Sequence, residues 1–235
     1  MKIRLLWLML MLVVPVGTQA GVIEAAPVDA YRPLKAAEAE SVREGFEAAW
    51  LVRLGEALGS EVALIDASVG GYLRFGKLDS GAAYYSSEIA ALAGNEAGPA
   101  DWPDLAGEPF CVTEESPHTD LVVSRFGGVA RTYPSVAQAL IGLKLGECQA
   151  VVGDRVLLQQ IAELPEWRRF DRLLPKLENK PLTLRIEAAD TALQKRIEQF
   201  TASKQGEGAL AEVTQHWIEE VAFQAYVLAD TLDCH

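Results

Sequence analysis

Polar side chains follow two of the apolar segments in the middle of the chain, where they could contact a small ligand. The expected strand 110–113 leads to Ser116, and the expected strand 150–152 leads to Asp154. Open α/β sheets hold small ligands at the carboxyl ends of their strands, so a hydroxyl and a carboxylate at these positions are candidates for ligand contact. Asp154 would also suit the N-cap of the helix expected to run to residue 162, and the two roles are compatible.

The segments around these residues alternate between two patterns. Apolar runs of strand length alternate with helices whose apolar residues recur every three or four positions. One helix is marked by Ser135, with Gln138 three residues later, as in a capping box. The alternation predicts an α/β fold with mostly parallel sheets, whereas residues 21–40 show no strong strand. The expected strands are 61–65, 89–93, 110–113, 129–132, 150–152 and 182–186, and the Gly/Pro stretch 94–99 is the expected linker.

The first 20 residues have the layout of a secretory signal peptide. Lys2 and Arg4 precede the apolar run 5–16, which is too short for a comfortable membrane span, and Ala20 stands at the expected cleavage point. We expect cleavage rather than an uncleaved anchor, and therefore a periplasmic chain of 215 residues without membrane insertion. Loss of the two basic residues takes the formal net charge from −12 to −14, which argues against nucleic acid and anionic membranes as partners.

The chain has three cysteines, which suit an oxidising compartment. Cys111 lies in one expected strand and Cys148 at the start of another, and we predict a disulfide between them. A disulfide that closes the loop between residues 111 and 148 would stabilise the fold by roughly 3–4 kcal/mol on the chain-entropy model. Cys234 is then left as a free thiol or as a residue that pairs between chains.

Most of the mature chain, from about residue 44 to 217, resembles family 3 of the bacterial periplasmic solute-binding proteins, the polar amino-acid binders of ABC importers. The resemblance rests on the order and spacing of short segments, none of which is specific alone. These segments are Gly45-Phe46-Glu47, Tyr84-Tyr85-Ser86-Ser87, Trp102-Pro-Asp-Leu-Ala-Gly107, Ala150-Val-Val-Gly-Asp154, and Glu207-Gly-Ala-Leu-Ala211 through Trp217.

The resemblance implies an α/β, two-lobed periplasmic-binding-protein type II fold, with the ligand in a cleft that closes by a hinge. After the signal peptide 1–20, the first lobe would comprise residues 21–94 and 182–217. The second lobe would comprise residues 95–181, and residues 218–235 would form a C-terminal helical extension. The two crossings between the lobes would lie near 89–94 and near 182–185.

The resemblance also implies ligand contacts for a zwitterionic amino acid. Arg74 stands ten residues ahead of the tyrosine pair, where the family has an arginine that binds both oxygens of the ligand carboxylate. Asp154 would bind the ammonium, and Ser116 stands where a family hydroxyl binds the carboxylate. Tyr31 and Tyr72 would stack on the ligand side chain. A purely structural role is also possible for most of them: Arg74 could be a solvated surface residue, Asp154 an N-cap, and the two tyrosines ordinary core or surface aromatics.

The loop after residue 113 departs from the glycine-rich family pattern. Glu114 and Glu115 add two carboxylates, which would repel an anionic group and favour a cationic or amine-bearing ligand. With His118 they could bind a metal, but an acidic loop is more often solvated, and we expect no metal and no cofactor. The expected partners are a small polar ligand and the permease of an ABC importer, with the protein a monomer.

The first lobe is shorter than the family pattern, which leaves two other functions open. One βα unit between residue 65 and Arg74 is missing or merged. The alternative is a non-transport accessory protein of the same fold that docks on an exported enzyme, such as a quinoprotein dehydrogenase. A third hypothesis is an enzyme resembling cyclohexadienyl dehydratases, but the three histidines form no recognisable catalytic constellation, so we expect no enzyme.

Overall fold

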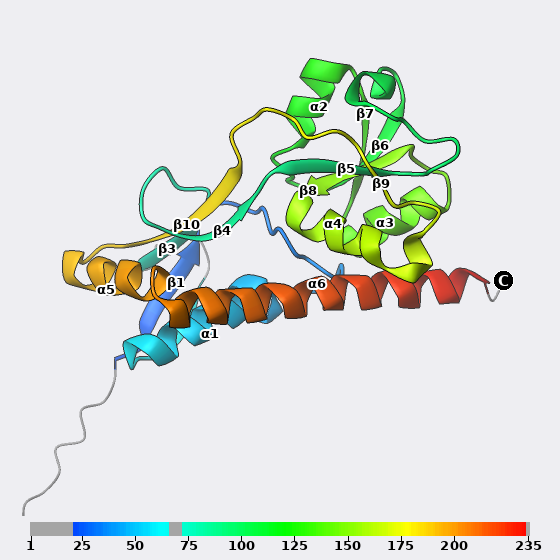
Figure 1. Cartoon of the computed structure of the whole chain (residues 1–235). Coiled ribbons are helices and arrows are strands. Elements are labelled where there is room, and N and C mark those ends of the chain that lie inside the picture. The colour runs from blue at the N-terminus through cyan, green and yellow to red at the C-terminus, as the bar shows by residue number, and fades with distance from the viewer. Residues whose placement is uncertain (1–20, 66–71, 234–235) are drawn as a thin grey trace, which may run out of the picture.

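The chain folds into two α/β lobes, each built on a five-stranded sheet (Figure 1). A computed structural model describes residues 21–65 and 72–233. The expected signal peptide, Gly70-Gly71 and Cys234 lie outside the described residues. No helix in the described ranges is both long and apolar enough to cross a membrane.

The first sheet carries the start of the chain. In spatial order it contains β2 (Val62–Leu64), β1 (Ile23–Pro27), β3 (Leu73–Gly76), β10 (Leu182–Ala188) and β4 (Ala82–Ser87). β1 is parallel to both of its neighbours, so the carboxyl ends of β1 and β3 meet at one edge. β10 is antiparallel to β3 and β4, which brings the carboxyl end of β4 to the same edge.

The second sheet forms the second lobe. In spatial order it contains β7 (Val129–Tyr133), β6 (Pro109–Thr113), β8 (Ala150–Asp154), β5 (Ile89–Ala93) and β9 (Arg172–Leu173). β6 is parallel to β7 and β8, whereas β5 is antiparallel to β8 and β9. Cys111 on β6 forms the predicted disulfide with Cys148, with the two Cα atoms 5.6 Å apart.

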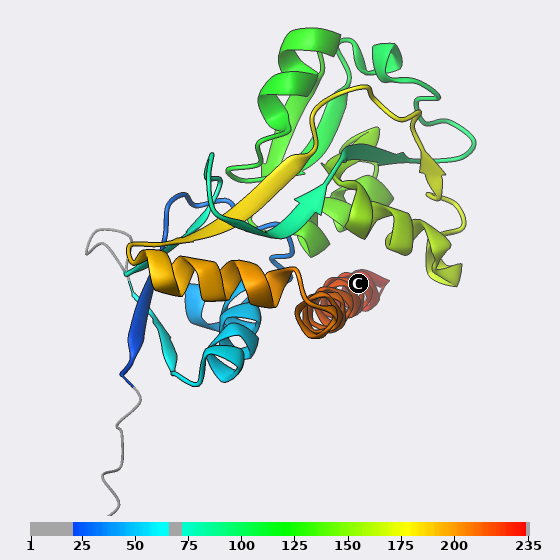
Figure 2. The same ribbon diagram turned by 60° about the vertical axis from the view of Figure 1, so that its left-hand side comes forward.

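Helices cover the sheets and one of them joins the lobes. The α-helices are α1 (Phe46–Leu58), α2 (Thr119–Phe126), α3 (Val136–Lys144), α4 (Arg155–Glu163), α5 (Thr191–Thr201) and α6 (Lys204–Asp233), and the short 3₁₀ helices are Val42–Glu44, Trp102–Leu105 and Pro165–Trp167. α6 packs on α1 and α5 of the first lobe and on α3 and α4 of the second. Figure 1 shows α6 running along the lower side of both lobes, and Figure 2 shows it nearly end-on, beside α1 and α5 and below the second lobe.

One apolar core extends through both lobes. Trp50 and Leu73 of the first lobe belong to the same buried cluster as Leu140 and Leu157 of the second, and Val221 of α6 completes it. A second cluster fills only the other face of the second sheet. The two lobes therefore share a dry interior on the side of α6, instead of meeting only at hinge strands.

Three expectations about the elements need correction. β1 was not expected, because small residues such as Ala25 and Ala26 give a weak strand pattern; both are buried in the first sheet. β5 was expected at a crossing between the lobes, but it pairs with β8 and β9 inside the second sheet, where all five of its residues are buried. The chain crosses from the first lobe to the second just before it, at Glu88. Residues 218–233 are helical as predicted, but they continue α6, which runs unbroken from Lys204, instead of forming a distinct extension.

Candidate functional site

A buried carboxylate connects the two lobes. Asp154 ends β8 and is 2% exposed. Its Oδ2 accepts hydrogen bonds from the hydroxyls of Tyr31 (2.7 Å) and Tyr85 (2.8 Å), both in the first lobe. Its Oδ1 lies 2.7 Å from Nε2 of His118, in the second lobe. We call Asp154, Tyr31, Tyr85 and His118 the interlobe latch.

Both tyrosines of the latch are held as hydroxyl donors. Burial raises the pKa of Tyr31 well above its usual value, and the negative charge of Asp154 raises it further. Burial and the same carboxylate act in the same direction on the pKa of Tyr85. Both phenols therefore keep their protons at neutral pH and donate them to the carboxylate, so Asp154 accepts from two hydroxyls and lies against an imidazole.

The position of Asp154 follows from the crossing between the lobes. It pairs with Ile89 at the start of β5, directly after Glu88. Arg155, the next residue, donates its backbone N–H to the carbonyl of Glu88 at 2.8 Å. Asp154 stands at the N-cap position of α4, as expected, but its side chain makes no cap hydrogen bond to the helix. Its carboxylate is turned toward the first lobe instead.

The altered loop after β6 supplies His118. Ser116 is buried, and its Oγ accepts the backbone N–H of His118 at 3.4 Å, a long contact that forms part of the turn. Glu115 has a φ of 58°, the left-handed conformation for which glycine is favoured. Glu114 and Glu115 are exposed, and His118 is directed at Asp154 instead of at them. Among the described residues no three His, Cys, Asp or Glu side chains form a metal-binding group.

There is little free space beside Asp154 and Ser116. The cavity there measures about 10 Å³, which is at most the space of one water molecule. The segment that follows Tyr31 closes it, because Pro33 and Leu34 are buried there. The carbonyl of Lys35 also accepts the backbone N–H of Val136, the first residue of α3, at 3.1 Å. A helix N-terminus suited to an anion is thus already occupied by the chain itself.

Two of the five predicted ligand residues lie away from this group. Arg74 is on β3, where its side chain is 55% exposed and forms an ion pair with Glu187, its cross-strand neighbour on β10, at 3.3 Å. Tyr72 is exposed just before β3. The structure brings together Tyr31, Ser116 and Asp154 around the small cavity and leaves Arg74 and Tyr72 outside it.

A larger cavity lies beside the latch, at the carboxyl ends of β1 and β3. It measures about 270 Å³ and is lined by Pro27, Asp29, Ala30, Tyr31, Arg32, Lys35, Glu47, Phe75, Gly76 and Tyr84. Tyr31 borders both this cavity and the small one at Asp154. We call this space the first-lobe cavity.

The sequence reasoning did not single out Glu47 or the partnership of His118 with Asp154. Glu47 is 5% exposed in the first turn of α1, and burial raises its pKa to about 7. The signal was present, because position 47 shares the helical spacing of the apolar residues Trp50, Leu51 and Leu54. An acid on the buried face of a helix is unusual and points to a functional or paired group.

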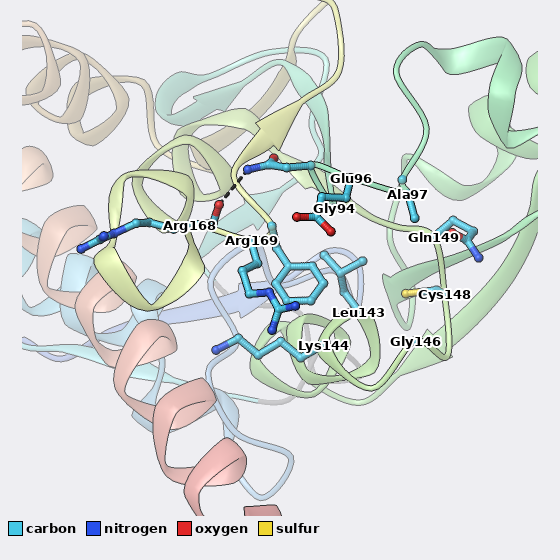
Figure 3. A pocket seen from close by; sticks show the side chains of 13 residues that line it. Gly94, Glu96, Ala97, Leu143, Lys144, Gly146, Cys148, Gln149, Arg168 and Arg169 are labelled. Atoms are coloured by element: carbon cyan, nitrogen blue, oxygen red, sulfur yellow. Dashed lines mark hydrogen bonds between the residues drawn. The ribbon is translucent and has the colours of Figure 1, made fainter.

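A separate pocket lies at the far end of the second lobe. It measures about 430 Å³ and is formed around Gly94, Glu96, Lys144, Arg168 and Arg169, among others. Figure 3 shows the Arg168 side chain pointing away from the pocket and Arg169 extending toward Lys144. The pocket lies past Ala93 and Ala150, the end of the β5–β8 pair opposite Asp154, so it is not at the ligand-binding edge of the sheet.

Comparisons with known proteins identify the fold. No family model matches the chain, and no curated protein matches it significantly. Among solved structures, the substrate-binding protein of an amino-acid ABC transporter aligns at 15% identity over 85% of this chain and 100% of its own, with a TM-score of 0.59. The VFT2 domain of Bordetella pertussis BvgS aligns at 16% identity over 83% and 93%, with a TM-score of 0.58.

An ancestral arginine-binding protein bound to arginine is similar at 14% identity over 85% and 99%, with a TM-score of 0.58. These neighbours confirm the predicted α/β, two-lobed periplasmic-binding-protein fold. The chain covers nearly the whole length of each of these relatives. At this identity the likeness establishes the fold and not the ligand.

Proposed function

We propose that the chain is an exported solute-binding protein that captures a small amine-bearing molecule for an ABC importer. The observation that carries the proposal is the charge at the lobe junction. Asp154 is buried at the carboxyl end of β8, and within the described residues no lysine or arginine pairs with it. A buried carboxylate whose partners are two hydroxyls and an imidazole is suited to a cationic group that displaces one of them.

The surroundings favour an amine over a zwitterionic amino acid. An amino-acid carboxylate needs a fixed cation or free amide donors. Arg74, the residue expected to provide the cation, is engaged on the surface by Glu187. The amide of Val136 is engaged by the Lys35 carbonyl. Asp29 and Glu47 add further negative charge near Tyr31.

The likeness to binding proteins of known transporters supports the periplasmic and importer parts of the proposal. The transport role predicts genes for a permease and an ATPase beside this one. Binding at Asp154 also requires the lobes to separate, because the cavity there is about 10 Å³. Opening would break the two tyrosine hydrogen bonds, and a ligand ammonium would replace them.

A thermal-shift screen of the mature protein against amines, amino acids and small organic acids tests the proposal. A ligand at a hundred times its dissociation constant stabilises the folded state by about 2.7 kcal/mol. For a chain of this size that raises the melting temperature by roughly 5–10 °C. We expect hits among amines and none among organic acids. A screen in which nothing shifts the melting of well-folded protein would contradict the proposal.

One feature favours a second candidate, the non-transport accessory protein that docks on an exported enzyme. α6 packs on helices of both lobes, and the apolar core continues across them, so hinge opening would expose buried surface. An accessory protein needs no opening. This candidate predicts a silent ligand screen, a gene for a periplasmic oxidoreductase nearby, and co-purification with that enzyme that survives Asp154→Asn.

A further inference from the structure

The first-lobe cavity contains a buried acid without a partner. The Glu47 side chain forms no ion pair and no hydrogen bond with any other residue in the ranges that the structure describes; its carboxylate accepts only its own backbone N–H. The residue is 5% exposed, and it lines a cavity of about 270 Å³. Buried carboxylates are normally paired or hydrogen-bonded, so this one is suited to an external partner.

No other polar group of the cavity pairs with Glu47: the charge of Arg32 lowers the pKa of Glu47, but by less than burial raises it. The guanidinium of Arg32 binds the Glu40 carboxylate at 3.2 Å and also donates to the carbonyls of Glu40 and Ser41. Lys35 lines the cavity but forms no ion pair within the described ranges. The carboxylate of Asp29 accepts the backbone N–H groups of Tyr31 and Lys77.

The cavity also provides hydrogen-bonding and apolar surface. The hydroxyl of Tyr84 has no hydrogen-bond partner in the described part of the chain, and Tyr84 is close enough to Glu47 for that carboxylate to raise its pKa, after the larger effect of burial. Phe75 and the ring of Tyr31 line the walls. A carboxylate, a free hydroxyl and two aromatic rings are the groups that bind an ammonium on a short aliphatic chain.

We propose that the first-lobe cavity binds a small primary amine, with its ammonium on the carboxylate of Glu47. This inference rests on the proposed function for the class of ligand, an amine, and adds a site separate from Asp154: the amine binds within the first lobe at Glu47, without displacing the hydroxyls from Asp154. The latch then remains closed in the bound state. At this site the carboxylate of Glu47 recognises the charge of the amine.

The test uses the mature chain and two probes of the same length, putrescine and neutral 1,4-butanediol. Binding is measured by isothermal titration calorimetry and by thermal shift in wild type, Glu47→Gln, Asp154→Asn and Glu56→Gln. Glu56 is the matched control, an exposed acid on the same helix. We expect putrescine and not butanediol to bind wild type, and we expect Glu47→Gln to weaken putrescine at least tenfold. Glu56→Gln should have no effect.

The outcomes separate this site from the proposed function. Loss of binding in Glu47→Gln with retention in folded Asp154→Asn supports the site. Equal affinity in wild type and Glu47→Gln overturns the site and leaves the proposed function standing. Equal binding of butanediol overturns ammonium recognition. Failure of every amine in the screen overturns both.

Proton release gives a readout that a merely structural role of Glu47 would not change. Burial raises its pKa to about 7, so part of the population carries a proton at pH 7. A bound ammonium favours the ionised form of Glu47, so binding at pH 7 should release a fraction of a proton from its carboxyl group. The release is measured by calorimetry, as the difference in binding enthalpy between buffers with different ionisation enthalpies. The charged and titratable groups facing Glu47 are Asp29, Tyr31, Arg32, Lys35, Glu40 and Tyr84. Release that persists in Glu47→Gln would contradict the assignment.

Discussion

Two buried carboxylates lie on either side of Tyr31, and they differ in what surrounds them. Asp154 has three side-chain partners from both lobes and about 10 Å³ of free space. Glu47 has no side-chain partner within the described residues and borders about 270 Å³. The first acid is enclosed by the protein, whereas the second faces a cavity.

The difference indicates how the two acids contribute to stability and function. A buried charge with satisfied hydrogen bonds holds the structure together, and removal of one partner is costly. A buried charge without a partner destabilises the empty protein until something neutralises it. The latch therefore stabilises the closed arrangement, and the first-lobe cavity holds the unsatisfied group that a ligand would complete.

The largest effect is expected from Asp154→Ala. The change leaves two tyrosine hydroxyls and an imidazole buried without their acceptor. We expect a loss of about 4 kcal/mol in the free energy of unfolding and a melting temperature about 10 °C lower. Urea unfolding of the mature protein measures the first quantity and calorimetry the second.

Asp120→Ala is the matched control for this prediction. Asp120 is an exposed acid in the first turn of α2, so its removal should cost less than about 1 kcal/mol. If Asp154→Ala were as stable as the control, the latch would not hold the lobes together, and the contrast with Glu47 would disappear.

The second effect is a pH dependence that belongs to Glu47. Its pKa is about 7 in the folded state, against 4.5 for an ordinary glutamate, so the folded protein binds this proton more tightly than the unfolded chain does. The stability from the bound proton is complete below about pH 4.5 and is lost as the pH rises through 7. The loss is on the order of 3 kcal/mol.

Glu47→Gln isolates this contribution. The free energies of unfolding of both proteins are measured at pH 5 and pH 8. Relative to wild type, Glu47→Gln should become more stable by about 2.5 kcal/mol between these two pH values. Other titrating groups, such as Glu40, whose pKa burial also raises, contribute to both proteins and largely cancel in the difference. Parallel pH profiles would show that Glu47 is not an unneutralised buried acid.

The sequence was informative about the fold and about Asp154. Alternating strands and helices gave the α/β class, and the carboxyl end of β8 placed Asp154 at the edge where the lobes meet. Cys111 and Cys148 were predicted as a pair because each belongs to a buried strand region. These features depend on local sequence patterns and on the order of the strands, and the amino-acid sequence indicates both.

The rest of the site depends on contacts between distant segments. Tyr31 and Asp154 are 123 residues apart, and their hydrogen bond depends on how the lobes close. Arg74 had the expected spacing, but it lies on β3, where its cross-strand partner Glu187 on β10 engages it. The helical spacing of Glu47 places it on the apolar face of α1, but only the folded structure shows that its carboxylate borders a cavity.

A smaller effect distinguishes two adjacent tyrosines of β4. The Tyr85 hydroxyl donates to Asp154 at 2.8 Å, whereas the Tyr84 hydroxyl has no partner in the described ranges. Tyr85→Phe should cost about 1.5 kcal/mol, because a buried carboxylate loses one of its donors. Tyr84→Phe should be nearly neutral in stability but should weaken putrescine binding. Urea unfolding and calorimetric titration of both variants check this contrast, and a reversal of the two stability effects would contradict it.

The smallest effect is expected from Arg74→Ala. This variant tests whether Arg74 contacts the ligand, as the resemblance implies, or whether the ligand binds elsewhere. The Arg74–Glu187 pair is on the surface, and such pairs contribute about 0.2–1 kcal/mol because water screens them and both side chains lose freedom. We expect a stability change of at most that size and an unchanged affinity for any amine that binds. Titration of the variant with putrescine measures the affinity, and Arg53→Ala, on the exposed Arg53–Glu212 pair, is the matched control. A loss of affinity in Arg74→Ala alone would mean that Arg74 leaves Glu187 to contact the ligand, and recognition would then centre on a carboxylate instead of an ammonium.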